Sequence, residues 1–224
     1  LLRYSLKEWL KEEKMRKSIF GLFFMMFLTS FSEMRLNESP EYAIKIMYGN
    51  GYKSTLQNIL VDWDYNRDPA GTSLIGISGE KYLWDNIWDG SLDITAQVGL
   101  IRHLENNYQD DFFQYNAGVK FIWKKFPWSK YVRTKVYVLE GISYTDKIPY
   151  LEKENLDFSG KPHSNFLNYL EFGVGVNLRD VTRIEPLNDF YGGIGISHRS
   201  GIFGLINGVH GGSNYITFYL EKEF

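Results

Sequence analysis

The chain of 224 residues contains no cysteine. Disulfide bonds, thiolate nucleophiles and a lipoprotein anchor are therefore excluded, because each of them needs a cysteine side chain. The sequence also lacks an apolar run of about twenty residues, which is the length that a membrane-spanning helix requires. Its formal net charge is only −2, so no excess of basic residues indicates nucleic-acid binding.

The first residues have the features of an exported protein. Met15-Arg16-Lys17 is basic, Ile19–Leu28 is a short apolar run, and small residues follow it. This order predicts a signal peptide at 15–32. Residues 1–14 are then expected to be an upstream extension that takes no part in the fold, and residues 33–224 are expected to form a single domain.

The last ten residues alternate between apolar and polar side chains and end on an aromatic residue. Ile216, Phe218, Leu220 and Phe224 fall on one face, while Thr217, Tyr219, Glu221 and Glu223 fall on the other. Such a strand is typical of a barrel that meets lipid on one face and a polar lumen on the other. Aromatic residues make up 17% of the chain, which fits the aromatic girdles of outer-membrane barrels.

Strand-like segments recur between turn signals along the whole chain. With the terminal strand they number nine: 41–49, 57–66, 73–84, 91–104, 112–123, 130–144, 164–178, 190–200 and 215–224. Bacterial single-chain barrels have an even number of strands. The sequence therefore predicts an all-β fold, an eight-stranded antiparallel up-and-down transmembrane β-barrel, with 41–49 or 73–84 partly outside it. An aromatic-rich soluble β-sandwich is the alternative fold.

The connections orient this barrel. Phe126–Ser129 has the shortness of a periplasmic turn, whereas 145–163 is long and polar, as extracellular loops are. Counting strands onward makes 201–212 extracellular and places the end of strand 190–200 at the outer leaflet. The location that follows is the bacterial outer membrane.

Two polar residues at that end, His198 and Ser200, share the outward parity of Ile194 and Ile196. Two strand positions separate their Cα atoms by about 7 Å, which allows the imidazole to reach the hydroxyl. The pair therefore has either a chemical role or a simple position among lipid headgroups. The four histidines show no metal-ligand spacing, so no metal site is expected.

Several segments in the second half of the chain resemble outer-membrane barrels related to PagL-type lipid A deacylases. The resemblance is carried by His198-Arg199-Ser200-Gly201-Ile202-Phe203-Gly204, Gly211-Gly212-Ser213-Asn214, Glu140-Gly141-Ile142-Ser143-Tyr144 and Leu167-Asn168-Tyr169-Leu170-Glu171-Phe172. It implies that Ser200 is the nucleophile and His198 the base, and that the substrate is an ester-linked acyl chain of lipid A in the outer leaflet. No cofactor is implied.

The chain departs from that family at two positions. Asn214 stands where the family has the acid that orients the histidine, and Gly201 follows Ser200 where the family has Asn. The oxyanion donors would then be backbone amides, those of Gly201 or Gly204. Glu140, with outward parity, is a possible substitute acid, although two strands are expected to separate it from His198.

The remaining polar candidates are expected in the lumen. Glu171 has inward parity and is expected to join Arg133 or Lys135 there, with Arg199 in the same network. The alternative function is a non-catalytic barrel with a structural, adhesive or small-porin role. The partners expected are lipopolysaccharide and the membrane, and no nucleic acid; a homodimer is left open.

Overall fold

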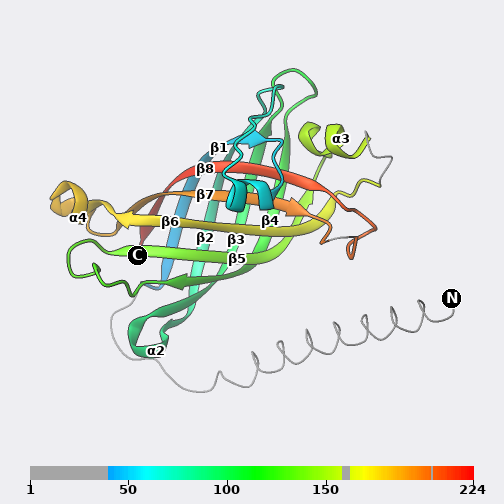
Figure 1. Cartoon of the computed structure of the whole chain (residues 1–224). Coiled ribbons are helices and arrows are strands. Elements are labelled where there is room, and N and C mark those ends of the chain that lie inside the picture. Colours follow the sequence, from blue (N-terminus) through cyan, green and yellow to red (C-terminus); the bar gives the residue numbers. More distant parts are fainter. Residues whose placement is uncertain (1–39, 158–161, 203) are drawn as a thin grey trace. The chain divides into compact units, whose positions relative to one another are not determined.

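A computed structural model describes residues 40–157, 162–202 and 204–224. Eight antiparallel strands follow one another in chain order around a closed barrel, in which β8 pairs with β1 (Figure 1). They are β1 (Tyr42–Tyr52), β2 (Ser73–Asn86), β3 (Leu92–Leu104), β4 (Phe112–Trp123), β5 (Thr134–Thr145), β6 (Phe166–Asn177), β7 (Phe190–Ser200) and β8 (Gly212–Glu223). The predicted all-β, eight-stranded antiparallel up-and-down barrel is confirmed.

Short helices occupy the connections between strands. They are the π-helical turn η1 (Asn58–Asp62), α2 (Ile87–Gly90), α3 (Tyr150–Asp157), α4 (Leu178–Thr182) and the 3-10 turn η2 (Glu185–Leu187). No helix among the described residues is long and apolar enough to cross a membrane. The predicted signal peptide at 15–32 and the extension at 1–14 lie outside the described residues.

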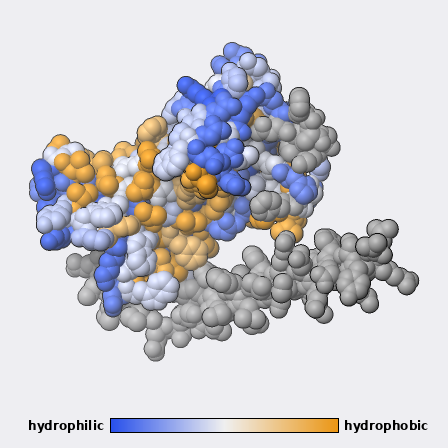
Figure 2. Space-filling model, in the orientation of Figure 1, coloured by the Kyte–Doolittle hydropathy of each residue, from blue (hydrophilic) through white to orange (hydrophobic). Residues whose placement is uncertain are grey.

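The strands have an apolar outer face and a polar inner one. In β1, Ile44, Ile46 and Tyr48 are about half exposed on the outside, while Lys45 is buried in the lumen. Figure 2 shows apolar side chains on the barrel wall and hydrophilic ones gathered on loops. Because the barrel is closed, its sheet has no unpaired strand edge. Its exposed apolar outer face is suited to contact with lipid and not with water.

The lumen is filled by paired charges. Lys120 contacts Glu80 and Glu221, each at 2.8 Å, and Lys135 contacts Glu221 at 2.8 Å. These four side chains are at most 4% exposed. Eight strands enclose a space that side chains can fill, so this network leaves no room for a wide pore. The small-porin role therefore has no support from the interior.

Glu171 lies in the lumen, as its parity predicts, but its expected partners were wrong. Its carboxylate pairs with Lys45 and accepts hydrogen bonds from Tyr137 at 2.7 Å and Tyr169 at 2.9 Å. Lys135 is too far along the barrel, since it pairs in register with Gly175 rather than with a residue beside Glu171. Sequence parity gives the face of a side chain but not its height in the barrel.

The strand prediction for 57–66 was also wrong. This segment forms η1 and an irregular continuation, with Trp63 in the left-handed backbone conformation at φ 54°. β1 pairs directly with β2, so 41–49 and 73–84, which were suspected of lying partly outside, are full members of the barrel. No strand edge is left to pair with 57–66, so the alternation of this segment in the sequence does not correspond to two faces of a strand.

The connections fall into two sets at opposite ends of the barrel. The β1–β2, β3–β4, β5–β6 and β7–β8 loops share one end, and residues 53–72 and 146–165 are the longest of them. The β2–β3, β4–β5 and β6–β7 turns share the other end with the chain terminus Phe224. Outer-membrane barrels have short periplasmic turns and longer outer loops, so the extracellular side predicted from the sequence is the end that carries the first set. We call the two sets the loop end and the turn end.

Candidate active site

His198 and Ser200 lie on the outer wall at the loop end of β7. Their neighbours Ser197 and Arg199 are buried in the lumen at 3% and 2% exposure, whereas Ile194, of the same parity as His198, is 51% exposed. Strand alternation therefore directs the side chains of His198 and Ser200 outward. Ser200 makes no hydrogen bond to His198 in the described structure, and catalytic hydrogen bonds of this kind often tighten only when substrate binds.

Asn214 on β8 pairs in register with His198, and their side chains are hydrogen-bonded. His198 Nδ1 is 2.7 Å from Asn214 Oδ1, and Asn214 Nδ2 donates to the Ser54 carbonyl at 2.9 Å. The bond to Ser54 fixes the amide, because only its nitrogen can donate to a carbonyl, so Oδ1 must face His198. An amide oxygen only accepts, so the histidine proton in this bond is on Nδ1, and Nε2 is the unprotonated nitrogen of the neutral imidazole.

The cross-strand partner of Ser200 on β6 is Asn168. Its side chain faces outward, is 6% exposed, donates to the Gly141 carbonyl at 3.0 Å and also bonds the Glu140 carboxylate. Sequence reasoning missed Asn168, although a signal was present: it is a polar residue at an apolar-face position between Phe166 and Leu170. We call Glu140, Asn168, His198, Ser200 and Asn214 the outer polar cluster.

Glu140 lies closer to the histidine than the sequence suggested. The predicted separation of two strands was wrong, because only β6 lies between β5 and β7. Leu170 pairs in register with both Glu140 and His198, so the three residues share one row across the wall. Two strand spacings amount to about 10 Å, so Glu140 cannot replace Asn214 in orienting the imidazole.

The two glycine amides suggested as oxyanion donors already have acceptors. The Gly201 N–H donates to the Gly211 carbonyl at 3.3 Å, and the Gly204 N–H donates to the Val209 carbonyl at 2.9 Å. The close packing in this loop leaves no space for a side chain at Gly201, where a Cβ would lie 2.0 Å from the Val209 carbonyl oxygen. An oxyanion at either amide would have to displace an existing hydrogen bond.

Arg199 lies on the lumen side of β7, opposite the outward-facing His198 and Ser200. Its guanidinium is buried in the barrel mouth, where Nη1 contacts both carboxylate oxygens of Glu152 on α3, at 2.6 and 2.8 Å. Ser213 Oγ donates to the same carboxylate at 2.8 Å, and Arg199 Nε donates to Ser143 at 2.9 Å. Arg199 therefore does not join the Glu171 network, as the sequence suggested, but ties β7, β8 and α3 together behind His198 and Ser200.

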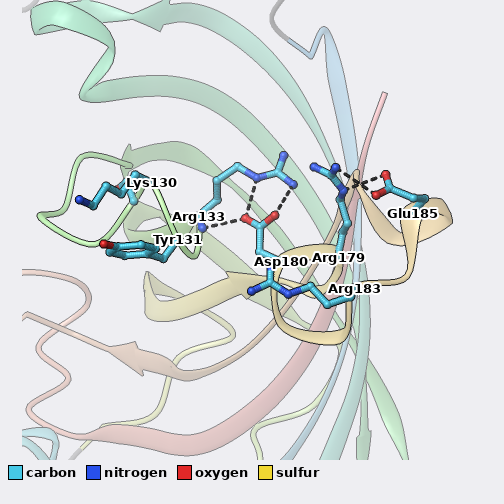
Figure 3. Close-up of a pocket in the computed structure, with 8 residues that line it drawn as sticks. Lys130, Tyr131, Arg133, Arg179, Asp180, Arg183 and Glu185 are labelled. Atoms are coloured by element: carbon cyan, nitrogen blue, oxygen red, sulfur yellow. Dashed lines mark hydrogen bonds and ion pairs between the residues drawn. The ribbon is translucent and has the colours of Figure 1, made fainter.

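A pocket at the turn end gathers charges of a different kind (Figure 3). It has a volume of about 380 Å³, and Arg133, Arg179, Asp180 and Glu185 are among its lining residues. Asp180 accepts hydrogen bonds from Arg133, which lower the pKa of this carboxyl to about 2, and Arg179 pairs with Glu185 at 2.9 Å. Lys130 and Arg183 also line the pocket, so four cationic side chains face two acidic ones and the pocket carries a net positive charge. No cluster of three or more potential metal ligands occurs in the described part of the chain.

The fold and the apolar wall define the class of protein: an eight-stranded β-barrel of the bacterial outer membrane, with a polar cluster on its lipid-facing side. Among solved structures, the chain is similar to the outer-membrane enzyme PagL, with 12% identity and a TM-score of 0.50 over 81% of this chain and 99% of that one. It is also similar to Neisserial surface protein A, with 14% identity and a TM-score of 0.43 over 82% and 96%. No protein-family model and no curated protein matches the sequence. At such identities the likeness concerns the fold alone.

Proposed function

We propose that the chain is a serine-dependent ester hydrolase that removes an ester-linked acyl chain from lipid A in the outer leaflet. The observation that carries the proposal is the hydrogen-bonded series from His198 to Asn214 to Ser54 on the outer wall. This series holds the imidazole in the tautomer that a general base needs, and Ser200 lies on the same face of the same strand. A nucleophile on the lipid side suits a substrate that is itself a lipid.

The reaction follows from these positions. Ser200 Oγ attacks the ester carbonyl carbon while His198 Nε2 takes the hydroxyl proton. The tetrahedral intermediate then breaks its bond to the lipid alcohol, which receives that proton from His198. Water next attacks the acyl-enzyme, again with His198 as base, and releases the fatty acid and regenerates Ser200. No cofactor is required.

Asn214 supports this chemistry without supplying charge. In serine proteases, replacing the aspartate by asparagine lowers kcat about 10⁴-fold because the histidine then takes the wrong tautomer. Here the Ser54 carbonyl fixes the Asn214 amide with its oxygen toward His198, which avoids that loss. The imidazolium still lacks a negative partner, so a slower reaction than that of a complete triad is expected.

Asn168 is added to the oxyanion candidates Gly201 and Gly204. Paired residues on adjacent strands have Cα atoms about 5 Å apart, so the Asn168 amide lies within a side chain's reach of the carbonyl that Ser200 attacks. To bind the oxyanion, the Asn168 amide would give up its hydrogen bond to Glu140 or to the Gly141 carbonyl. The Gly201 amide has the longest of the existing hydrogen bonds at this site and is the easier of the two glycine amides to redirect.

The test is mass spectrometry of lipid A from cells that carry no copy, the wild type, Ser200→Ala or Ser197→Ala. Ser197 is the matched control because it lies on the same strand but faces the lumen. We expect one acyl chain to be lost with wild type and Ser197→Ala, and no loss with Ser200→Ala. If the folded wild type leaves every acyl chain in place, the barrel is not a lipid A deacylase and a structural or adhesive role takes precedence.

A further inference from the structure

The β1–β2 loop, residues 53–72, has two parts. Asp68, Ala70 and Thr72 are buried at the mouth of the barrel, whereas the segment before them is bonded to its outer wall. Ser54 bonds Asn214, which belongs to the outer polar cluster. Near the other end of the loop, Arg67 donates to the Asn50 side chain at 3.0 Å, and Asn50 in turn accepts from Tyr48 at 3.3 Å. Tyr48 is 46% exposed on the lipid-facing side of β1. Ser54 and Arg67, which flank the loop tip, are therefore both bonded to side chains on the lipid-facing wall.

Ring packing brings the tip of the loop to the same wall. Tyr65 packs edge-on against Tyr52, whose parity matches that of Tyr48, with ring centroids 6.5 Å apart. The base is fixed by Asp68, which accepts hydrogen bonds from the backbone of Ala70 and Thr72. Figure 1 draws the cyan helical turn of this loop over β7 and β8, in agreement with the Ser54–Asn214 bond.

The tip exposes apolar side chains that nothing in the described chain covers. Val61 is 66% exposed and Trp63 is 73% exposed, with Leu60 and Tyr65 about half exposed, while Ile59 is buried and anchors the turn. Exposed apolar clusters of this kind mark membrane or protein contacts. Tryptophan and tyrosine are the residues enriched at membrane–water interfaces. Tyr65 connects the patch to Tyr52 on the lipid-facing wall, and this connection favours lipid as the partner of the patch.

We propose that the loop tip Leu60–Tyr65 contacts the outer leaflet beside the outer polar cluster and forms an apolar wall for the acyl chains of a bound lipid. The contact with lipid stands on the loop geometry, whereas the role toward a substrate rests on the proposed function. Asp62 and Asp64 are exposed between the apolar residues, and charged side chains are costly at the bilayer midplane, so we place the tip at the interface and not in the hydrocarbon centre.

The absence of cysteine makes a direct test simple. Single cysteines at Val61, Val98 and Asp110 are labelled with an environment-sensitive fluorophore in the full barrel, reconstituted in phosphatidylcholine vesicles. Val98 is a matched lipid-facing control with the same 66% exposure, and Asp110 is an outer-loop control whose side chain is 90% exposed. Brominated lipids and aqueous iodide serve as quenchers.

We expect the label at Val61 to be quenched by brominated lipid at least half as strongly as the label at Val98, and to be protected from iodide relative to Asp110. Trp63→Cys is expected to give the same result and guards against a misfolded Val61→Cys barrel, which gel migration before and after heating would detect. Labels at Val61 and Trp63 that both behave like the label at Asp110 would overturn the inference. This readout is independent of hydrolysis, so inactivity toward lipid A would leave it standing.

Discussion

Removing Glu152 should destabilise the barrel more than the loss of any exposed ion pair. Arg199 and Glu152 are at most 2% exposed and are joined by two contacts of 2.6 and 2.8 Å. Breaking a buried pair by removing one partner costs about 3–5 kcal/mol, because the other charge is left in a low-dielectric site. Glu152→Ala should therefore lower the free energy of unfolding by about that amount. Glu152→Gln should cost less, since it keeps one acceptor for Arg199.

The assay is urea unfolding of the detergent-folded barrel, followed by tryptophan fluorescence and by gel migration. A double-mutant cycle isolates the pair: Arg199→Met together with Glu152→Ala removes both charges and should be less destabilising than Glu152→Ala alone. A loss below about 1 kcal/mol for Glu152→Ala, or strictly additive costs in the cycle, would refute the reasoning. In that case water, and not a dry ion pair, would have to fill the mouth behind β7.

Two further predictions concern the loop end. Burial raises the pKa of Glu105, which lies just after β3, to about 7. The native state then holds its proton where the unfolded chain has lost it, so this contribution is complete below about pH 4.5 and is lost as the pH rises to about 7. Unfolding free energies measured from pH 4.5 to 8 should fall by up to about 3 kcal/mol, and Glu105→Gln should flatten the profile. For the proposed hydrolase, Asn168→Leu should lower kcat about 10²–10³-fold, as expected when an oxyanion donor is removed, with KM little changed. Phe166→Leu on the same face is the control, and an unchanged kcat in Asn168→Leu would assign the oxyanion to the glycine amides.

The barrel itself could be predicted from the sequence because apolar and polar side chains must alternate along nearly every strand. One strand face meets lipid and the other a lumen of paired charges, so side-chain parity can be read directly, as for Ile46 and Lys45. The number of strands was less accessible. The alternation of 57–66 is as clean as that of a true strand, and only the direct pairing of β1 with β2 shows that it has no place in the sheet.

The sequence did not predict which side chains contact one another across the barrel, or at what height along the barrel axis each side chain lies. The parity of Glu171 placed it in the lumen, but its partner Lys45 lies on β1, far away in the chain and close only because the sheet closes. The same holds for Ser54, whose carbonyl holds Asn214 from a loop of which residues 57–66 were predicted to be a strand. Contacts that form only when the sheet closes depend on the register of the strands and on the course of the loops. Neither of these produces a recognisable pattern in a single sequence.

Polar residues on the lipid face carry more functional information than polar residues in the lumen. In the lumen, Lys120 and Glu221 are explained by each other, and their presence follows from the need to fill a polar interior. On the wall, Asn168 and His198 occupy positions where apolar side chains would contact lipid, and they hydrogen-bond to Gly141 and Asn214 instead. Near the interface that replacement costs up to about 1 kcal/mol per residue, so it is tolerated, but nothing in folding requires it. Five such residues gathered on four adjacent strands, with the histidine tautomer fixed from a loop, therefore support the proposed hydrolase over a purely structural barrel.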